Sequence, residues 1–183
     1  PENAGCLIVT DGVFSMGGDI AKLPEIVRLA KQYGARVMVD DAHGLGTLGK
    51  GGRGTPSHFG LEQEVDVYMG TFSKSLASLG GYMAGKSRIV DYVRHNSRPF
   101  IFSASVPPAS CAAALAALNV LEEEPELPER LLRLSDFFRE ALKQRGMSIR
   151  ESRTPIVPIF TYTADRTLRI AMELYKQGLF CLL

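Results

Sequence analysis

Apolar and polar positions alternate along the first part of the chain in a pattern that predicts strands and helices in turn. Short apolar runs indicate buried strands at residues 6–10, 36–39, 65–69, 82–84 and 100–102. Helical spacing of apolar residues, with start and stop signals, predicts helices over 23–33, over 87–96 with Ser87 as the cap, and over 107–124. Strands that alternate with helices are typical of an α/β domain with a parallel-rich sheet and flanking helices.

The pattern changes near residues 123–130, where Pro125 and Pro128 are expected to break the preceding helix. Beyond them the spacing predicts a helix over 131–144, a strand over 156–162, a helix over 165–177 and a final buried strand after Gly178. We therefore expect an α/β unit over residues 1–125 and the start of a smaller α+β domain over 126–183. Because the chain begins with Pro and its last strand stops abruptly, we expect it to be a fragment.

Composition narrows the function classes. The 183 residues carry 21 Lys+Arg against 20 Asp+Glu, so no basic surface for nucleic acid is expected. The longest helix-like apolar run, Cys111–Leu118, is far shorter than the roughly 20 residues of a membrane span, so no transmembrane segment is expected. Cys6, Cys111 and Cys181 are odd in number and far apart, which favours neither disulfides nor a metal site. They favour a reducing, cytoplasmic location.

The glycine-rich segment after residue 43 matches two nucleotide-binding patterns, G-x-G-x-x-G over Gly44–Gly49 and G-x-x-x-x-G-K over Gly44–Lys50. The first pattern needs a helix to follow, and the further glycines and Pro56 indicate that none starts there. The second needs Ser or Thr after the Lys, where Gly51 stands. Nucleotide binding by this segment is therefore not expected.

Two other segments hold candidate chemistry. Asp40 and Asp41 lie at the carboxyl end of a predicted strand, where open α/β sheets bind ligands, and only one of these neighbours can face a given ligand. His43 follows, although ordinary turn chemistry explains these residues equally well. After the next strand, Lys74 lies in the segment Gly70–Ser75. Burial in an apolar setting would lower its pKa and favour Schiff-base formation, whereas the alternative is an exposed loop lysine.

Taken together, these groups match the needs of pyridoxal phosphate. An aspartate keeps the pyridine nitrogen protonated, a lysine forms the Schiff base with the aldehyde, and small hydroxyl residues hold the phosphate. The strand-end Asp40, His43 three residues later and the T-x-x-K of Thr71–Lys74 supply this set in order.

Five segments resemble the α-oxoamine synthases, fold-type-I pyridoxal-phosphate enzymes that condense an amino acid with an acyl-CoA or acyl thioester, releasing CoA and usually CO₂. They are Thr10–Asp19 (TDGVFSMGGD), Val39–Gly46 (VDDAHGLG), Gly52–Gly54 (GRG), Gly70–Ser75 (GTFSKS) and Ser97–Pro108 (SRPFIFSASVPP). The resemblance implies that residues 1–125 are the second half of the cofactor-binding large domain. It also implies that 126–183 begin the C-terminal small domain.

The resemblance implies a role for each candidate residue. Lys74 is expected to be the Schiff-base lysine and the base that removes the α-proton, Asp40 the partner of the pyridine nitrogen, and His43 the ligand of the cofactor's phenolic oxygen. The further cofactor contacts are assigned to hydroxyl residues: Thr71, Ser73, Ser15, Ser103 and Ser105. The last two are expected to reach the phosphate of a neighbouring subunit, which implies a homodimer with a shared active site.

The chain departs from the family pattern in ways that leave the substrates open. The family's upstream half, with its ring-stacking histidine, and its downstream carboxylate-binding arginine have no counterpart in residues 1–183, so these residues alone are expected to be inactive. The segment around Lys74 is similar to serine palmitoyltransferases, whereas VDDAHG is similar to 8-amino-7-oxononanoate synthases, so the amino acid and acyl chain stay open. Two alternatives remain: another fold-type-I enzyme, such as an aminotransferase, lyase or decarboxylase, and a non-catalytic paralogue, which typically loses the lysine.

Overall fold

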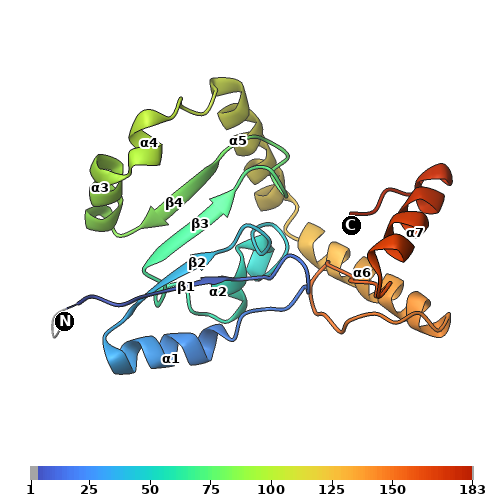
Figure 1. The fold of residues 1–183 in the computed structure, drawn as a ribbon. Helices are drawn as coiled ribbons and strands as arrows, with labels where there is room; N and C mark the ends of the chain where they lie inside the picture. The colour runs from blue at the N-terminus through green and yellow to red at the C-terminus, as the bar shows by residue number, and fades with distance from the viewer. Residues whose placement is uncertain (1–3, 183) are drawn as a thin grey trace.

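Four strands form one sheet in the order β1-β2-β3-β4 (Figure 1). The structure, a computed structural model, describes residues 4–182. The strands are β1 (Leu7–Asp11), β2 (Arg36–Asp40), β3 (Val67–Thr71) and β4 (Gly81–Gly85). The first three run parallel, and β4 is antiparallel to β3. Because parallel strands end at the same edge, the loops after β1, β2 and β3 lie together.

Helices flank this sheet (Figure 1). They are α1 (Leu23–Tyr33), α2 (Thr55–His58), α3 (Ser87–Asn96), α4 (Arg98–Phe102), α5 (Pro108–Glu123), α6 (Leu127–Gln144) and α7 (Ala164–Lys176), with a 3-10 turn at Lys50–Gly52. In Figure 1, α1 lies on one side of the sheet and α3 to α5 on the other, while α6 and α7 lie beyond it. The parallel-rich α/β fold with flanking helices is therefore confirmed, and the domain boundary at 125/126 stays a prediction.

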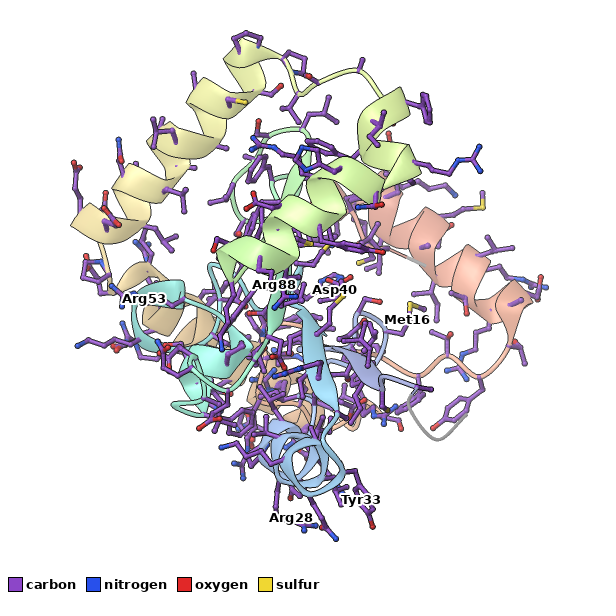
Figure 2. The ribbon with its side chains drawn as sticks, turned by 90° about the vertical axis from the view of Figure 1, so that its left-hand side faces the viewer. Met16, Arg28, Tyr33, Asp40, Arg53 and Arg88 are labelled. Carbon is purple, nitrogen blue, oxygen red and sulfur yellow. The ribbon has the colours of Figure 1, made fainter. Side chains whose placement is uncertain are left out.

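The main hydrophobic core lies between α1 and β2. On α1, Leu23, Val27 and Ala30 recur at helical spacing and are buried, and Val37 and Val39 alternate toward them from β2. Val65 completes the cluster. The opposite face of α1 is polar, with Arg28 and Tyr33 pointing away from the sheet (Figure 2).

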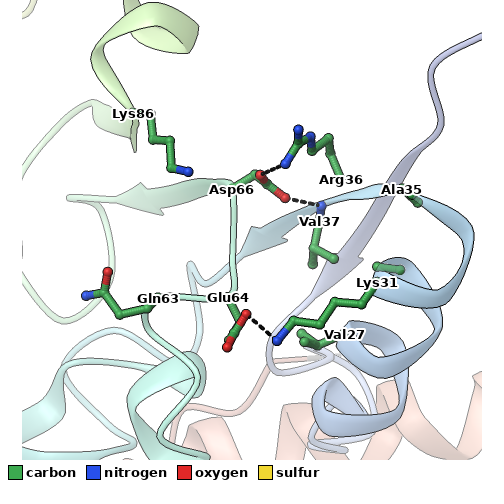
Figure 3. Close-up of a pocket in the computed structure, with 11 residues that line it drawn as sticks. Val27, Lys31, Ala35, Arg36, Val37, Gln63, Glu64, Asp66 and Lys86 are labelled. Atoms are coloured by element: carbon green, nitrogen blue, oxygen red, sulfur yellow. Dashed lines mark hydrogen bonds and ion pairs between the residues drawn. The ribbon is translucent and has the colours of Figure 1, made fainter.

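At the amino end of the sheet, Asp66 links β2 to β3 (Figure 3). Its Oδ2 accepts a hydrogen bond from the amide of Val37 at 2.9 Å, and its Oδ1 lies 3.1 Å from the guanidinium of Arg36. The Asp66 side chain is only 14% exposed. Nearby, Lys31 pairs with Glu64 at 2.6 Å, but both of these side chains are substantially exposed. Asp66 therefore connects β2 to the start of β3, at the edge of the sheet opposite the loops that follow β1, β2 and β3.

We expect Asp66→Ala to lower the free energy of unfolding by about 1–3 kcal/mol, because the Val37 amide loses its side-chain acceptor in a partly buried place. Glu64→Ala is the matched control and should cost at most about 1 kcal/mol, since exposed ion pairs contribute little. Urea unfolding of both variants checks the difference. Equal losses would show that Asp66 acts only as a surface charge.

Several sequence expectations at the ends of elements are wrong. Residues 100–102 belong to helix α4 and not to a strand, because Pro99 in its first turn has a backbone angle suited to a helix start. Ser87 is the first residue of α3 and does not cap it; Lys86 stands at the cap position. Pro128 likewise starts rather than breaks a helix, since it lies in the first turn of α6.

The glycine-rich segment does contain helical turns, contrary to expectation. The 3-10 turn Lys50–Gly52 and the short helix α2 both lie within it. Helix α2 begins directly after Gly54, whose positive φ of 99° is readily adopted only by glycine. Pro56 lies in the first turn of α2, where proline is favourable. A four-residue helix of this kind still lacks the phosphate-facing geometry that the two nucleotide-binding patterns require.

The two strands predicted in the C-terminal part are absent from the described residues. Over 156–162 the chain makes only an isolated bridge between Ile149 and Ile159, because Pro155 and Pro158 have no amide hydrogen to donate. Residues 179–182 are exposed and without regular structure, and Leu183 lies outside the described residues. Within the described residues no strand pairs with residues 179–182, so this apolar segment does not form a strand.

Within residues 4–182, no helix is long and apolar enough to cross a membrane. Cys6, Cys111 and Cys181 are free and exposed in the same range. Over these residues no group of three or more His, Cys, Asp or Glu side chains could hold a metal ion.

Candidate active site

Asp40 is the last residue of β2, at the edge where the parallel strands end (Figure 2). Its side chain is half-buried, and its Oδ1 accepts a hydrogen bond from the amide of Ala42 at 3.1 Å. The backbone carbonyl of Asp40 accepts from the amide of Gly12 at 2.7 Å, which ties it to the end of β1. The register also aligns Asp11 with Asp40. The edge therefore presents two carboxylates side by side.

The neighbouring Asp41 is only 4% exposed and points into a different environment. Its Oδ2 accepts a hydrogen bond from the amide of Thr55 at 2.7 Å. A Cβ on Gly12, Gly44 or Gly54 would overlap the Asp41 carboxylate, so the loop after β1 and two parts of the long connection after β2 close around it. The two adjacent acids thus have different surroundings: Asp41 is buried among the loops, and Asp40 remains at the edge where the parallel strands end.

Burial raises the pKa of the Asp41 carboxyl, and the hydrogen bond from the Thr55 amide opposes this only in part. Among the described residues, Asp41 Oδ1 and Thr55 Oγ1 are buried without a hydrogen-bond partner. An asparagine could keep the acceptor for the Thr55 amide and add an N–H donor, with no charge to bury.

We therefore expect the free energy of unfolding of Asp41→Asn, compared with that of the unmodified chain, to increase as pH rises. The folded state of the unmodified chain binds the Asp41 proton more tightly than the unfolded state, whose pKa is near the ordinary 3.8. Its free energy of unfolding consequently falls as pH rises from that value through the raised pKa, whereas the asparagine does not titrate. Unfolding in urea at about pH 4 and about pH 8 measures this difference.

The matched control for this experiment is Asp91→Asn, which makes the same substitution at an exposed position on α3, where no carboxyl is buried. If Asp41→Asn instead loses stability relative to the unmodified chain as pH rises, the buried carboxylate is stabilising in its charged form and the assignment is wrong.

Lys74 lies in the tight loop between β3 and β4. This loop is closed by hydrogen bonds from the amide of Phe72 to Gly80 at 2.9 Å and from the amide of Ser78 to Phe72 at 2.7 Å. The apolar setting expected for Lys74 is wrong for this chain, because its side chain is exposed. The loop follows β3 directly, so the amine lies at the same edge as the end of β2.

His43 lies in the loop after β2 and is half-buried. Burial lowers its pKa, as does the charge of Lys74, while the carboxylates of Asp11 and Asp40 raise it. The charges of Lys74, Asp11 and Asp40 therefore lie close enough to the His43 ring to affect its pKa. The loop after His43 also packs on the Lys74 loop, since a Cβ on Gly46 would lie 2.5 Å from Cβ of Ser75.

Hydroxyl side chains lie in and beside the loop that carries Lys74. Oγ1 of Thr71 lies 2.8 Å from Oγ of Ser73, and it donates to the carbonyl of Gly80 at 3.1 Å. Ser103 and Ser105 are exposed on the connection from α4 to α5. The following residue, Val106, packs on the same loop, because a Cβ on Gly80 would lie 2.8 Å from its Cγ2.

Ser15 is exposed in the turn Phe14–Asp19, after β1. The turn closes through hydrogen bonds between Phe14 and Gly18 at 2.8 Å and between Phe14 and Asp19 at 2.9 Å. Met16, beside Ser15, is 80% exposed near the end of β2 in Figure 2. The loops that carry the predicted residues thus gather at one edge, while the roles of these residues stay predictions.

Two groups were not identified as candidates from the sequence. Asp11 is a strand-end acid of the same kind as Asp40, so the rule that found one could have found the other. Thr55 had no comparable signal, because its amide reaches Asp41 from fourteen residues away and only the fold reveals this contact.

Comparison with known proteins identifies the family. Residues 1–182 match the family described as aminotransferase class I and II. The chain belongs to this family. It is 50% identical over 174 residues to the 8-amino-7-oxononanoate synthase of Thermosipho melanesiensis, and 48% identical over 180 residues to the serine palmitoyltransferase of Sphingobacterium spiritivorum. These alignments cover 95% and 98% of the chain.

The chain spans less than half the length of these curated relatives, 44% and 45% respectively. Among solved structures, the serine palmitoyltransferase of S. paucimobilis with a bound PLP–myriocin aldimine matches with a TM-score of 0.93 and 35% identity. That match covers all of this chain and 48% of the other. The 8-amino-7-oxononanoate synthase of Francisella tularensis matches with a TM-score of 0.82 and 27% identity. The fold-type-I large domain inferred from the sequence is confirmed.

Proposed function

We propose that this chain is part of a pyridoxal-phosphate-dependent C-acyltransferase of the α-oxoamine synthase type. Such an enzyme condenses a small amino acid with an acyl-CoA or acyl thioester and releases CoA and usually CO₂. The observation that carries the proposal is the meeting of Asp40, His43 and Lys74 at the carboxyl edge of the sheet. The similarity to an 8-amino-7-oxononanoate synthase and a serine palmitoyltransferase supports it.

The residues present fit pyridoxal phosphate. Asp40 keeps a half-buried carboxylate at the strand edge, with one oxygen fixed by the Ala42 amide, which suits a protonated ring nitrogen. The exposed amine of Lys74 is accessible to an aldehyde, and the Thr71 and Ser73 hydroxyls are suited to a phosphate or to the cofactor's edge. Among the described residues, no competing ion pair occupies Asp40 or Lys74.

Each side chain then has a distinct task. Pyridoxal phosphate, when bound, withdraws the electron pair left at the substrate's α-carbon. Lys74 supplies the amine that attaches the cofactor, and once released it accepts the α-proton as a base. Asp40 holds a proton at the ring nitrogen. His43, whose pKa burial lowers, remains a neutral hydrogen-bonding group toward the cofactor's phenolic oxygen.

The amino acid and the acyl chain are tested by measuring CoA release from the complete enzyme that contains this chain. Serine, glycine and alanine should each be paired with acyl-CoA of short and long chain, because the two kinds of relative are almost equally similar. CoA release with one pair supports the proposal and identifies the substrate class. Amino-group transfer to a 2-oxo acid without CoA release would instead support the aminotransferase alternative.

The same proposal includes the assembly and the location. Ser103 and Ser105 are exposed on a connection beside the Thr71 loop, which supports contact with a cofactor held by a second subunit in a homodimer. The three free cysteines support a reducing, cytoplasmic compartment. Light scattering of the complete enzyme tests the dimer.

A further inference from the structure

The turn Phe14–Asp19 is held by a segment more than a hundred residues away in sequence. The carbonyl of Gly18 accepts hydrogen bonds from Ser152 Oγ at 2.8 Å and from Thr154 Oγ1 at 3.1 Å. Asp19 also pairs with Arg150 at 3.1 Å. The turn that carries Ser15 is therefore anchored to the C-terminal part of the chain.

Thr154 is the centre of this anchor. It is fully buried, and its Oγ1 also accepts from the amide of Ile156 at 3.3 Å and lies 2.9 Å from Ser152 Oγ. The approach is close, because a Cβ on Gly18 would lie 2.7 Å from Ser152 Oγ and 3.0 Å from Thr154 Oγ1. Gly18 also has a φ of +67°, so the anchor is built around a glycine at this position.

A buried arginine fixes Thr154 from the other side. Arg139, on α6, is 4% exposed, and its Nη1 donates to the carbonyl of Thr154 at 2.7 Å. Its Nη2 pairs with Asp136 at 2.5 Å and reaches Ser135 Oγ at 3.4 Å. Burying a guanidinium costs free energy of desolvation unless it is hydrogen-bonded. Because Arg139 donates to the Thr154 carbonyl, this bond holds the 152–154 segment in one position.

We propose that Thr154 is a positioning residue that sets the Phe14–Asp19 turn, and with it Ser15, against the cofactor edge. The chain of contacts runs from Arg139 through Thr154 to the Gly18 carbonyl. The part of the proposal that concerns the cofactor depends on the proposed function, whereas the anchoring of the turn does not. Thr154 acts through Gly18 and touches no reacting atom.

The first test measures hydrogen exchange in the complete enzyme that contains this chain. Thr154→Val keeps the shape of the side chain but removes the hydroxyl. We expect the peptide that covers Phe14–Asp19 to exchange about three- to tenfold faster, because the amides of Phe14 and Gly18 report opening of the turn. Thr154→Ser should restore slow exchange. Thr161→Val is the matched control, because the Thr161 hydroxyl pairs with Thr167 within the C-terminal part and should leave the turn unchanged.

The second test uses the complete enzyme and reads pyridoxal-phosphate binding from its visible absorbance. Thr154→Val should weaken binding about three- to tenfold, Thr154→Ser should recover it, and Thr161→Val should not change it. If Thr154→Val fails to fold, Ser152→Ala removes the other donor to Gly18 from a half-buried position and is measured in the same way.

Unchanged exchange of the turn in both Thr154→Val and Ser152→Ala would overturn the proposal. Faster exchange of the turn together with unchanged cofactor binding would overturn its functional part and leave Thr154 as a structural residue. An unmodified complete enzyme that binds no pyridoxal phosphate would contradict the proposed function, while the exchange result would still decide whether Thr154 anchors the turn.

Discussion

Lys74→Ala is expected to lower CoA release by the complete enzyme by roughly a thousandfold or more, because one amine both attaches the cofactor and accepts the α-proton. Lys74 is exposed, so this substitution should leave the free energy of unfolding almost unchanged. The loss would then be chemical and not structural. Turnover and urea unfolding, measured on the same preparation, separate the two effects.

Lys86→Ala provides the matched control, since Lys86 is also exposed and stands at the start of α3. It should keep full turnover. Borohydride reduction of the holoenzyme, followed by peptide mapping, gives an independent measurement, and the pyridoxyl group is expected on Lys74. A pyridoxyl group on any other lysine would show that the site is assigned wrongly.

Asp40→Asn is expected to lower turnover by about a hundredfold or more, because a neutral amide cannot stabilise the protonated ring nitrogen. The asparagine oxygen can still accept from the Ala42 amide, so the loop after β2 should keep its structure. CoA release and the absorbance spectrum of the bound cofactor are the measurements. The spectrum should change as well, since it reports the protonation of the ring.

Two neighbouring acids serve as controls for Asp40. Asp11→Asn changes the carboxylate aligned with Asp40 on β1, and Asp41→Asn changes the buried acid next to it in sequence. Both should reduce turnover far less than Asp40→Asn. Equal losses at Asp40 and Asp41, or a larger loss at Asp41, would mean that the wrong member of the pair has been assigned to the cofactor.

The sequence could predict those helices and strands whose buried residues recur at regular spacing within the element itself. Leu23, Val27 and Ala30 mark one face of α1, and Val37 and Val39 mark one face of β2, so both elements follow from periodicity. The strand-end rule likewise located Asp40 and His43 without knowledge of the sheet order. The sequence patterns grouped them with Lys74, and the pairing of β2 with β3 brings the loop of Lys74 to the same edge.

The failures have physical causes that differ from one segment to the next. Residues 100–102 were predicted as a strand, but Pro99 suits the start of a helix, and they lie in α4. Residues 179–182 were also predicted as a strand, but they pair with no strand in the described structure and remain exposed. Residues 156–162 fail for a different reason, because Pro155 and Pro158 limit pairing. Lys74 was expected to be buried, but within this chain nothing covers it.

The hydrogen bonds from Ser152 and Thr154 to Gly18 span 134 and 136 residues, which has a consequence for synthesis of the chain. A ribosome adds about 5–20 residues per second, so Gly18 is made roughly 7–27 s before its partners exist. During that interval the sheet strands β1 to β4 can already pair, while the turn that carries Ser15 has no anchor. A nascent chain stalled at residue 126 should therefore be cut by protease at this turn, and one stalled well after residue 183 should resist.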